Sequence, residues 1–108
     1  MNIVSRKMDL NKIPTLKTIY WKVTDGYVVV DSSKGHFILN NSSSLVWRCI
    51  DGCKTISDII NEIYEEHSRE NTLTYVEEIV CEAISEYLDK DLILLREEDD
   101  LDGWLQYE

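Results

Sequence analysis

Residues 39–60 read Leu39-Asn40-Asn41-Ser42-Ser43-Ser44-Leu45-Val46-Trp47-Arg48-Cys49-Ile50-Asp51-Gly52-Cys53-Lys54-Thr55-Ile56-Ser57-Asp58-Ile59-Ile60, and they contain two helix starts separated by a reversal. Asn and Ser side chains accept hydrogen bonds from the first free N–H groups of a helix, so Asn40 is expected to cap a helix that carries Trp47. Gly52 is expected to end that helix in a left-handed conformation. Thr55 with Asp58 is a variant capping box that opens the next helix.

Two residues of the first helix have expected packing roles. A small side chain at Ser43 would let the helix sit close to a sheet. Trp47 would be the large core anchor, worth about 3–5 kcal/mol against alanine when fully buried. Both roles concern the scaffold, so they say little about a ligand.

The preceding residues predict three antiparallel strands. Aromatic and β-branched residues dominate Ile19–Thr24 and Tyr27–Asp31. Asp25-Gly26 between them suits a two-residue type I′ turn. After the polar turn at residues 32–35, the third strand is expected at His36–Leu39.

The following residues predict a third helix with a broad apolar stripe. Thr74 and Glu77 form a regular capping box at its start. Its apolar positions follow the i, i+3, i+4, i+7 series and comprise Val76, Ile79, Val80, Ala83, Ile84, Tyr87 and Leu88. The polar residues 68–72 are expected to form a loop, and Leu92–Leu95 a closing segment that docks on the core.

The predicted fold class is α+β: winged helix-turn-helix-like, with a three-stranded antiparallel sheet followed by three helices. Residues 1–17 are expected to form an irregular N-terminal arm, and residues 18–96 the folded domain. Residues 97–108 are an acidic C-terminal tail with Trp104, Leu105 and Tyr107 near its end. A charge run of this kind is usually solvated, so the tail is expected to be disordered; the alternative is that its three apolar residues dock on the domain or on a partner.

Charge and hydropathy restrict the partners and the location. The formal net charge is −10, and residues 57–108 hold 17 acidic but only 3 basic side chains. Such a surface repels phosphates, which disfavours nucleic acid and favours a basic or apolar peptide. No apolar run approaches the ~20 residues that a membrane span needs. The N-terminus lacks the apolar region of a secretory signal, so we expect a cytoplasmic protein.

The sequence contains none of the common catalytic constellations. There is no Gly-x-Ser-x-Gly elbow and no P-loop. Cys49, Cys53 and Cys81 are expected to be free thiols. Cys49 and Cys53 could share one face of a helix, but Gly52 lies between them and is expected to end that helix. His36 and His67 have no obvious partner. We therefore expect no catalytic residue, no metal site and no cofactor.

The ordered motif set in residues 39–60 resembles the PqqD-like family, named for pyrroloquinoline quinone biosynthesis and known as recognition elements of ribosomally made, modified peptides. The matching pieces are Leu39-Asn40, Ser42, Ser43, Val46-Trp47, Ile50-Asp51-Gly52, Thr55-Ile56 and Ile59-Ile60. The resemblance extends from about Tyr20 to Leu95. It implies a non-catalytic adaptor that binds the leader segment of a precursor peptide and presents it to a maturation enzyme, such as a radical S-adenosylmethionine enzyme or a leader peptidase.

The resemblance also implies where the leader binds: as an added strand on the third strand, in a cleft beside the third helix. An edge strand with unpaired backbone groups is a template for strand addition. The candidate peptide-binding residues are His36, Phe37, Ile38, Leu39, Val76, Ile79, Val80, Ala83 and Ile84. The helical stripe can equally supply plain core. The acidic third helix leads to the hypothesis that the leader carries Lys or Arg.

Two other functions and two oligomeric states stay open at this point. A winged-helix transcriptional regulator shares the element order, although its third helix should be basic and residues 74–89 hold no Lys or Arg. A small redox protein would use Cys49 and Cys53. The exposed edge strand is compatible with a monomer or a homodimer.

Overall fold

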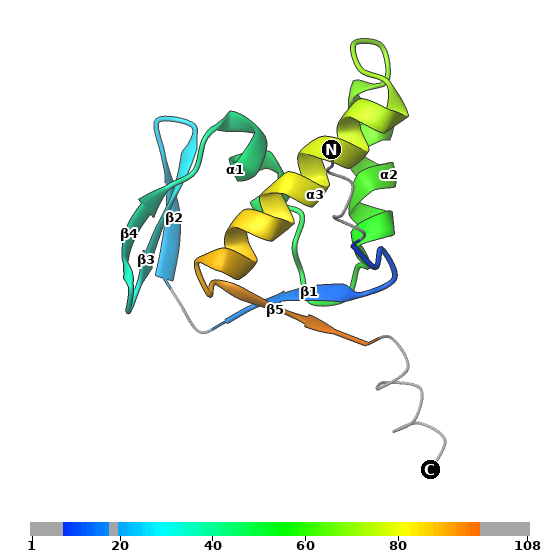
Figure 1. The fold of residues 1–108 in the computed structure, drawn as a ribbon. Helices are drawn as coiled ribbons and strands as arrows, with labels where there is room; N and C mark the ends of the chain where they lie inside the picture. Colours follow the sequence, from blue (N-terminus) through cyan, green and yellow to red (C-terminus); the bar gives the residue numbers. More distant parts are fainter. Residues whose placement is uncertain (1–7, 18–19, 98–108) are drawn as a thin grey trace, which may run out of the picture.

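The computed structural model describes residues 8–17 and 20–97 of the chain (Figure 1). In chain order, the elements are β1 (Ile13–Leu16), β2 (Tyr20–Thr24), β3 (Tyr27–Ser32), β4 (Gly35–Ile38), α1 (Asn41–Trp47), α2 (Ile56–His67), α3 (Leu73–Asp89) and β5 (Ile93–Arg96). The predicted α+β class, with a three-stranded antiparallel sheet followed by three helices, is confirmed. The residues of the predicted tail from 98 onward lie outside the described residues.

Strands β2, β3 and β4 form an antiparallel meander in that order. Asp25 and Gly26 have φ angles of 56° and 86°. Positive φ at both central residues is what a type I′ turn requires, and its twist matches that of the flanking strands. The Asp25-Gly26 turn therefore sets the register Thr24↔Tyr27 and, from it, the rest of the β2–β3 ladder.

A second sheet, which the sequence did not predict, pairs β1 with β5 in antiparallel register from Ile13↔Arg96 to Leu16↔Ile93. The irregular arm expected through residue 17 is therefore wrong for Ile13–Leu16. Pro14 signals a break in a sequence, but proline is compatible with an edge strand because it needs no ladder hydrogen bond there. The predicted docking of the closing segment is confirmed, because Leu92 and Ile93 are buried.

Helix α1 begins as predicted but ends earlier. The Asn40 side chain accepts a hydrogen bond from the Ser43 N–H at 2.8 Å, which confirms the cap. The helix ends at Trp47. Directly afterwards, the N–H groups of Cys49 and Ile50 donate to carbonyls three residues earlier, which forms a tighter turn in place of a further α-helical turn. Gly52 is consequently not the residue after the helix. It has a positive φ of 80° inside the following loop.

Ser44, rather than Ser43, joins α1 to the sheet. The buried Ser44 hydroxyl accepts from the Val28 N–H at 2.9 Å and donates to the Leu39 carbonyl at 3.0 Å. It thus bridges two backbone groups at the end of the β3–β4 ladder. Ser43 faces α3 instead, so the expected role of a small side chain against the sheet belongs to its neighbour.

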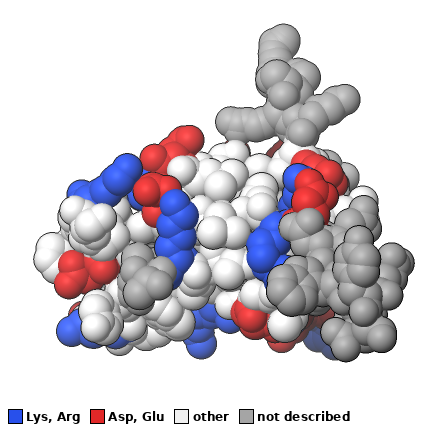
Figure 2. All heavy atoms as spheres, turned by 90° about the horizontal axis from the view of Figure 1, so that it is seen from below, with Lys and Arg blue, Asp and Glu red and all other residues white. Residues whose placement is uncertain are grey.

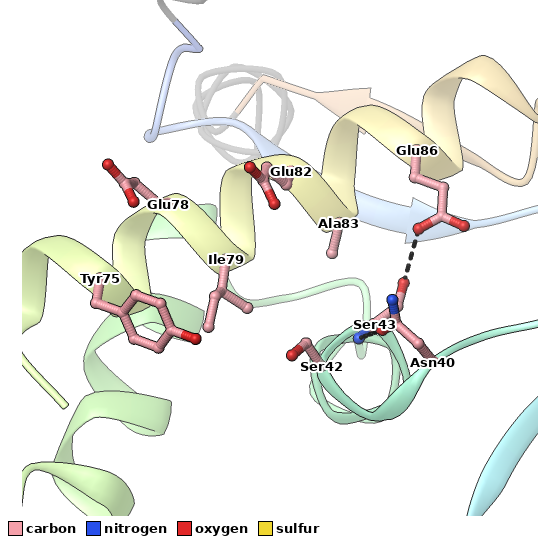
Figure 3. A pocket seen from close by; sticks show the side chains of 9 residues that line it. All are labelled: Asn40, Ser42, Ser43, Tyr75, Glu78, Ile79, Glu82, Ala83 and Glu86. Atoms are coloured by element: carbon pink, nitrogen blue, oxygen red, sulfur yellow. Dashed lines mark hydrogen bonds between the residues drawn. The ribbon is translucent and has the colours of Figure 1, made fainter. Parts of the chain in front are cut away.

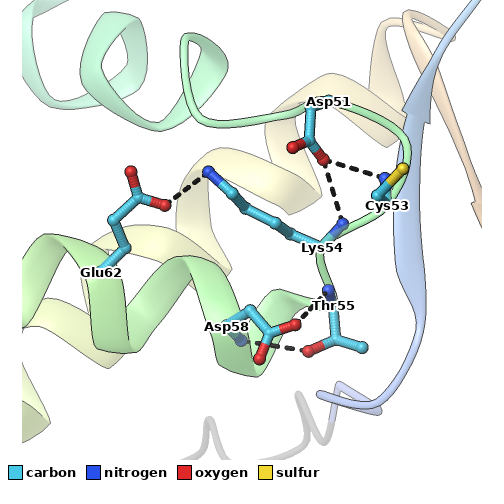
Figure 4. A network of polar contacts seen from close by, with 6 residues as sticks. All are labelled: Asp51, Cys53, Lys54, Thr55, Asp58 and Glu62. Atoms are coloured by element: carbon cyan, nitrogen blue, oxygen red, sulfur yellow. Dashed lines mark hydrogen bonds and ion pairs between the residues drawn. The ribbon is translucent and has the colours of Figure 1, made fainter.

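The start of α2 is confirmed, and a polar network precedes it (Figure 4). Thr55 and Asp58 exchange the two hydrogen bonds of a capping box. The Asp51 carboxylate accepts from the N–H groups of Cys53 and Lys54, and these hydrogen bonds lower its pKa. Lys54 then reaches Glu62 on α2, which raises the pKa of the lysine. The loop between α1 and α2 is therefore held at both ends.

Helix α3 begins at Leu73, so its cap lies two residues before the predicted one. Its cap is Thr72, whose side chain accepts from the Tyr75 N–H at 3.1 Å, so the predicted start at Thr74 is wrong. The core lies between the helices and the inner face of the larger sheet. At its centre, the rings of Trp47 and Tyr87 meet edge to face with centroids 5.0 Å apart.

Candidate peptide-binding edge and groove

Strand β4 forms an edge of the three-stranded sheet. It pairs with β3 on one side and with no described strand on the other. The Leu39 N–H donates to the Val28 carbonyl, toward β3. Because backbone groups alternate in direction along an antiparallel strand, His36 and Ile38 present their N–H and C=O groups to the free edge. The predicted edge strand is thus found with two residues available for pairing.

The side chains of β4 also alternate. His36 and Ile38 lie on the outer face of the sheet, and Ile38 is 73% exposed. Phe37 points inward, is partly buried, and has the Lys90 ammonium 5.4 Å from its ring centroid. Lys90 directly follows α3, so this contact places the end of α3 beside β4. Leu39, immediately after the strand, is fully buried.

A cavity of about 260 Å³ opens where the chain leaves β4, between the start of α1 and the exposed flank of α3 (Figure 3). Its lining residues are Asn40, Ser42, Ser43, Tyr75, Glu78, Ile79, Glu82, Ala83 and Glu86. Tyr75, Ile79 and Ala83 project from α3 toward α1 and give the cavity an apolar side. We call this cavity the α1–α3 groove.

Three carboxylates border the α1–α3 groove, four residues apart along α3. Glu86 accepts from the Ser43 hydroxyl at 3.0 Å and pairs with Lys90 at 3.2 Å. Glu78 and Glu82 are exposed. Among the described residues, no Lys or Arg lines the groove. The groove is therefore a negatively charged site with apolar walls, which suits a peptide with cationic and apolar side chains.

The predicted helix residues divide into two groups. Ile79 and Ala83 line the α1–α3 groove, and the buried Val76 lines an adjoining cavity. Val80 and Ile84 are fully buried and belong to the core cluster, as does Leu39. These three line neither cavity, so they support the site through packing.

The sequence pattern does not assign Tyr75 or Ser42 to the groove. Tyr75, which is 51% exposed, falls outside the apolar period of α3. The pattern around Ser42 indicates only the start of a helix. One signal was available in the sequence: the four-residue spacing of Glu78, Glu82 and Glu86 places them on one face of a helix.

The described residues offer little for covalent or metal chemistry. None of Cys49, Cys53 and Cys81 forms a disulfide among the described residues. Burial, together with the nearby Glu62 carboxylate, raises the pKa of the Cys49 thiol, which disfavours the reactive thiolate. Within residues 8–17 and 20–97, no cluster of three or more His, Cys, Asp or Glu could hold a metal ion.

Ion pairs neutralise lysines on the face that carries β1 and β5. Seen from below, this face has an uncharged centre, with basic and acidic side chains next to one another around it (Figure 2). Lys17 and Lys34 both pair with Asp91, and Lys12 pairs with Glu97. The hydrogen bond from Lys17 lowers the pKa of Asp91. Paired lysines leave little positive potential for a phosphate backbone.

Among the described residues, none of the helices combines the length and the apolar character that crossing a membrane requires.

The family model described as Coenzyme PQQ synthesis protein D (PqqD) matches residues 26–93. The chain belongs to the PqqD family. The matched PqqD region contains β3, β4, all three helices and the first residue of β5, and so both sides of the α1–α3 groove. Proteins of the PqqD family are non-catalytic accessory proteins, and membership supports a peptide-binding accessory role in the biosynthesis of PQQ or other ribosomally made peptides. A comparison with curated proteins gave no match, and a comparison with solved structures gave none either.

Proposed function

We propose that this protein binds the leader segment of a ribosomally made precursor peptide by strand addition to β4 and presents it to a modifying or proteolytic enzyme. The observation that carries the proposal is the free edge of β4, which leads directly into the α1–α3 groove. The protein itself performs no chemistry in this account. Its contribution is to hold an extended peptide in one register.

Backbone pairing supplies the affinity in this mode of binding, and side-chain pockets supply the selectivity. His36 and Ile38 offer two N–H donors and two C=O acceptors at the free edge. In an added strand, every second side chain points to the inner side, toward Phe37. Past Ile38, the peptide enters the α1–α3 groove, where Glu78 and Glu82 favour Lys or Arg beside apolar residues.

A proline substitution separates backbone pairing from side-chain contact. Proline at position 38 removes one outward N–H group and leaves the N–H groups of Phe37 and Leu39, which face β3, in place. Threonine at the same position also removes the exposed apolar side chain but keeps the N–H. Val23→Pro, on the free edge of β2, is the matched control on the opposite side of the sheet.

Peptides selected on the full chain from a displayed random library provide a probe for calorimetry. The proposal predicts that Ile38→Pro weakens binding at least tenfold, since it removes one hydrogen bond and leaves a peptide carbonyl unpaired. Ile38→Thr and Val23→Pro should change the affinity far less. Equal affinity of Ile38→Pro and Ile38→Thr for the peptide would contradict strand addition at β4.

A further inference from the structure

A second cavity, of about 200 Å³, lies where α1, α2 and α3 meet. Its walls are mainly apolar, with Ile63 from α2, Val76 from α3 and Leu45 from α1. The residues that line it are Ser42, Leu45, Ile63, His67, Asn71, Tyr75, Val76 and Ile79. We call it the three-helix cavity. Within the part of the chain that the structure describes, its walls hold no Asp, Glu, Lys or Arg, whereas three Glu side chains line the α1–α3 groove.

The two cavities adjoin. Ser42, Tyr75 and Ile79 line both of them. From Glu86 to Tyr75 the path follows eleven residues of α3, which is about 16 Å at 1.5 Å per residue. An extended chain advances ~3.3 Å per residue, so it covers this path in about five residues. A peptide that follows the groove along α3 therefore reaches the three-helix cavity within about five residues.

The chemistry of the cavity indicates which part of a peptide it accepts. Ile63 and Val76 are 4% and 2% exposed, so they form fixed walls. Asn71 is held by a hydrogen bond from its side-chain amide to the His67 carbonyl at 3.3 Å. Burying a charge against these walls would be costly, whereas an apolar side chain is stabilised by the apolar surface that it covers there. The volume accommodates one large apolar side chain.

We infer that the three-helix cavity is a second anchor site for the same leader peptide, occupied by a large apolar side chain about five residues beyond the segment paired with β4. This inference rests on the proposed function. It assigns the leader a pattern of three parts: a strand segment on β4, cationic residues beside Glu78 and Glu82, and then an apolar anchor. Selectivity then depends on the spacing of the parts as well as on their composition.

The test uses peptides selected on the full chain from a displayed random library, long enough to cover both sites. Leu45→Gln places a polar group in the wall of the three-helix cavity, and Asn71→Phe fills the cavity from the loop side. Leu88→Gln is the control, because Leu88 is exposed on α3 and lines neither cavity. Thermal unfolding followed by circular dichroism establishes that each variant is folded before binding is measured.

Each cavity variant should weaken the selected peptide about tenfold to a hundredfold, which is the range for losing one buried apolar side chain. The same peptide with its anchor residue changed to alanine should bind the wild type and Leu45→Gln equally, because contacting residues are coupled in a double-mutant cycle. In methyl NMR spectra, the peptide should shift the signals of Ile63 and Val76.

Two different results would separate the two claims. Full affinity in both cavity variants, with Ile63 and Val76 signals unmoved while Ile38 still shifts, overturns the second anchor site and leaves strand addition standing. Insensitivity of the selected peptide to Ile38→Pro overturns the proposed function itself. Signals of Ile63 or Val76 that shift on deletion of residues 98–108 without peptide would assign the cavity to the chain's own end, and this also overturns the inference.

Discussion

The Ser43 hydroxyl donates a hydrogen bond to Glu86 Oε1 at 3.0 Å, and this contact joins α1 to α3 across one end of the α1–α3 groove. The Tyr87 hydroxyl donates to the Ser43 carbonyl next to it. The two contacts join the walls of the groove, so the groove is already formed in the chain without a ligand. Preformed sites avoid part of the ordering cost of binding.

Loss of the Ser43 hydroxyl should therefore destabilise the fold. Ser43→Ala removes the hydrogen bond to Glu86, and we expect the free energy of unfolding to fall by about 0.5–1.5 kcal/mol. Ser42→Ala is the matched control, since Ser42 is exposed and its change should stay within about 0.5 kcal/mol. Urea denaturation measures both. Equal stability of the two variants would show that the contact across the groove contributes nothing.

Stability should decrease at alkaline pH because of Tyr87. Burial raises the pKa of this phenol above its ordinary value of 10.0. The native state therefore holds the proton more tightly than the unfolded state. The contribution of Tyr87 to the free energy of unfolding is fully present below pH 10 and is lost as the pH rises above that value. Tyr87→Phe removes the hydrogen bond to the Ser43 carbonyl, so its free energy of unfolding at neutral pH should be lower by about 1 kcal/mol. Its stability should then fall less steeply than the wild type's above pH 10.

The two threonines near the start of α3 give a direct test of where the helix begins. Thr72 accepts from the Tyr75 N–H, so Thr72→Ala should lower the free energy of unfolding by about 1 kcal/mol. Thr74→Ala, in the first turn, should be nearly neutral. Chemical denaturation of both variants checks this. If the helix instead began at the capping box that the sequence suggested, Thr74→Ala would be the more destabilised of the two variants.

Thiol reactivity should follow exposure. Cys53 is exposed, whereas Cys49 is partly buried and burial raises its pKa. Because the thiolate is the nucleophile, we expect iodoacetamide at neutral pH to alkylate Cys53 before Cys49. Peptide mapping after timed quenching gives the order. Faster labelling of Cys49 would mean that its surroundings open readily in solution.

Charge at the groove should control peptide binding. Glu82→Gln removes one carboxylate from the border of the α1–α3 groove, and we expect it to weaken a basic selected peptide and to reduce the salt dependence of its affinity. Glu65→Gln changes an exposed carboxylate of α2 that lines neither cavity and serves as the control. Calorimetry at low and high ionic strength compares them. An affinity that does not change with salt would rule out the basic leader.

Local patterns were enough to predict the parts of the fold that depend on neighbouring residues. Asp25-Gly26 marked the first hairpin, Asn40 the start of α1, and Thr55 the start of α2. Strand β1 could not be predicted in this way, because its partner β5 lies some eighty residues away and Pro14 resembles a break. The end of α1 was missed because Gly52 serves a later turn.

The candidate site was predictable only in part. The helical spacing of apolar residues identified Ile79 and Ala83, and the strand pattern of residues 36–39 identified Ile38. However, the same period also included Val80 and Ile84, whose burial depends on which side of α3 packs against the other elements. That orientation is a tertiary property. The contribution of Tyr75 was likewise hidden, since a residue on the flank of a helix becomes part of a groove only when a second helix forms the opposite wall.

Hydrogen–deuterium exchange at single amides is the sharpest test of strand addition to β4, because the sheet has two edges that no described strand covers and peptide is proposed to bind only at β4. On addition of a selected peptide, the amides of His36 and Ile38 on β4 should become protected. Those of Trp21 and Val23, which face the free edge of β2, should exchange as before. Protection at Trp21 and Val23, or no protection at His36 and Ile38 with bound peptide, would contradict strand addition to β4.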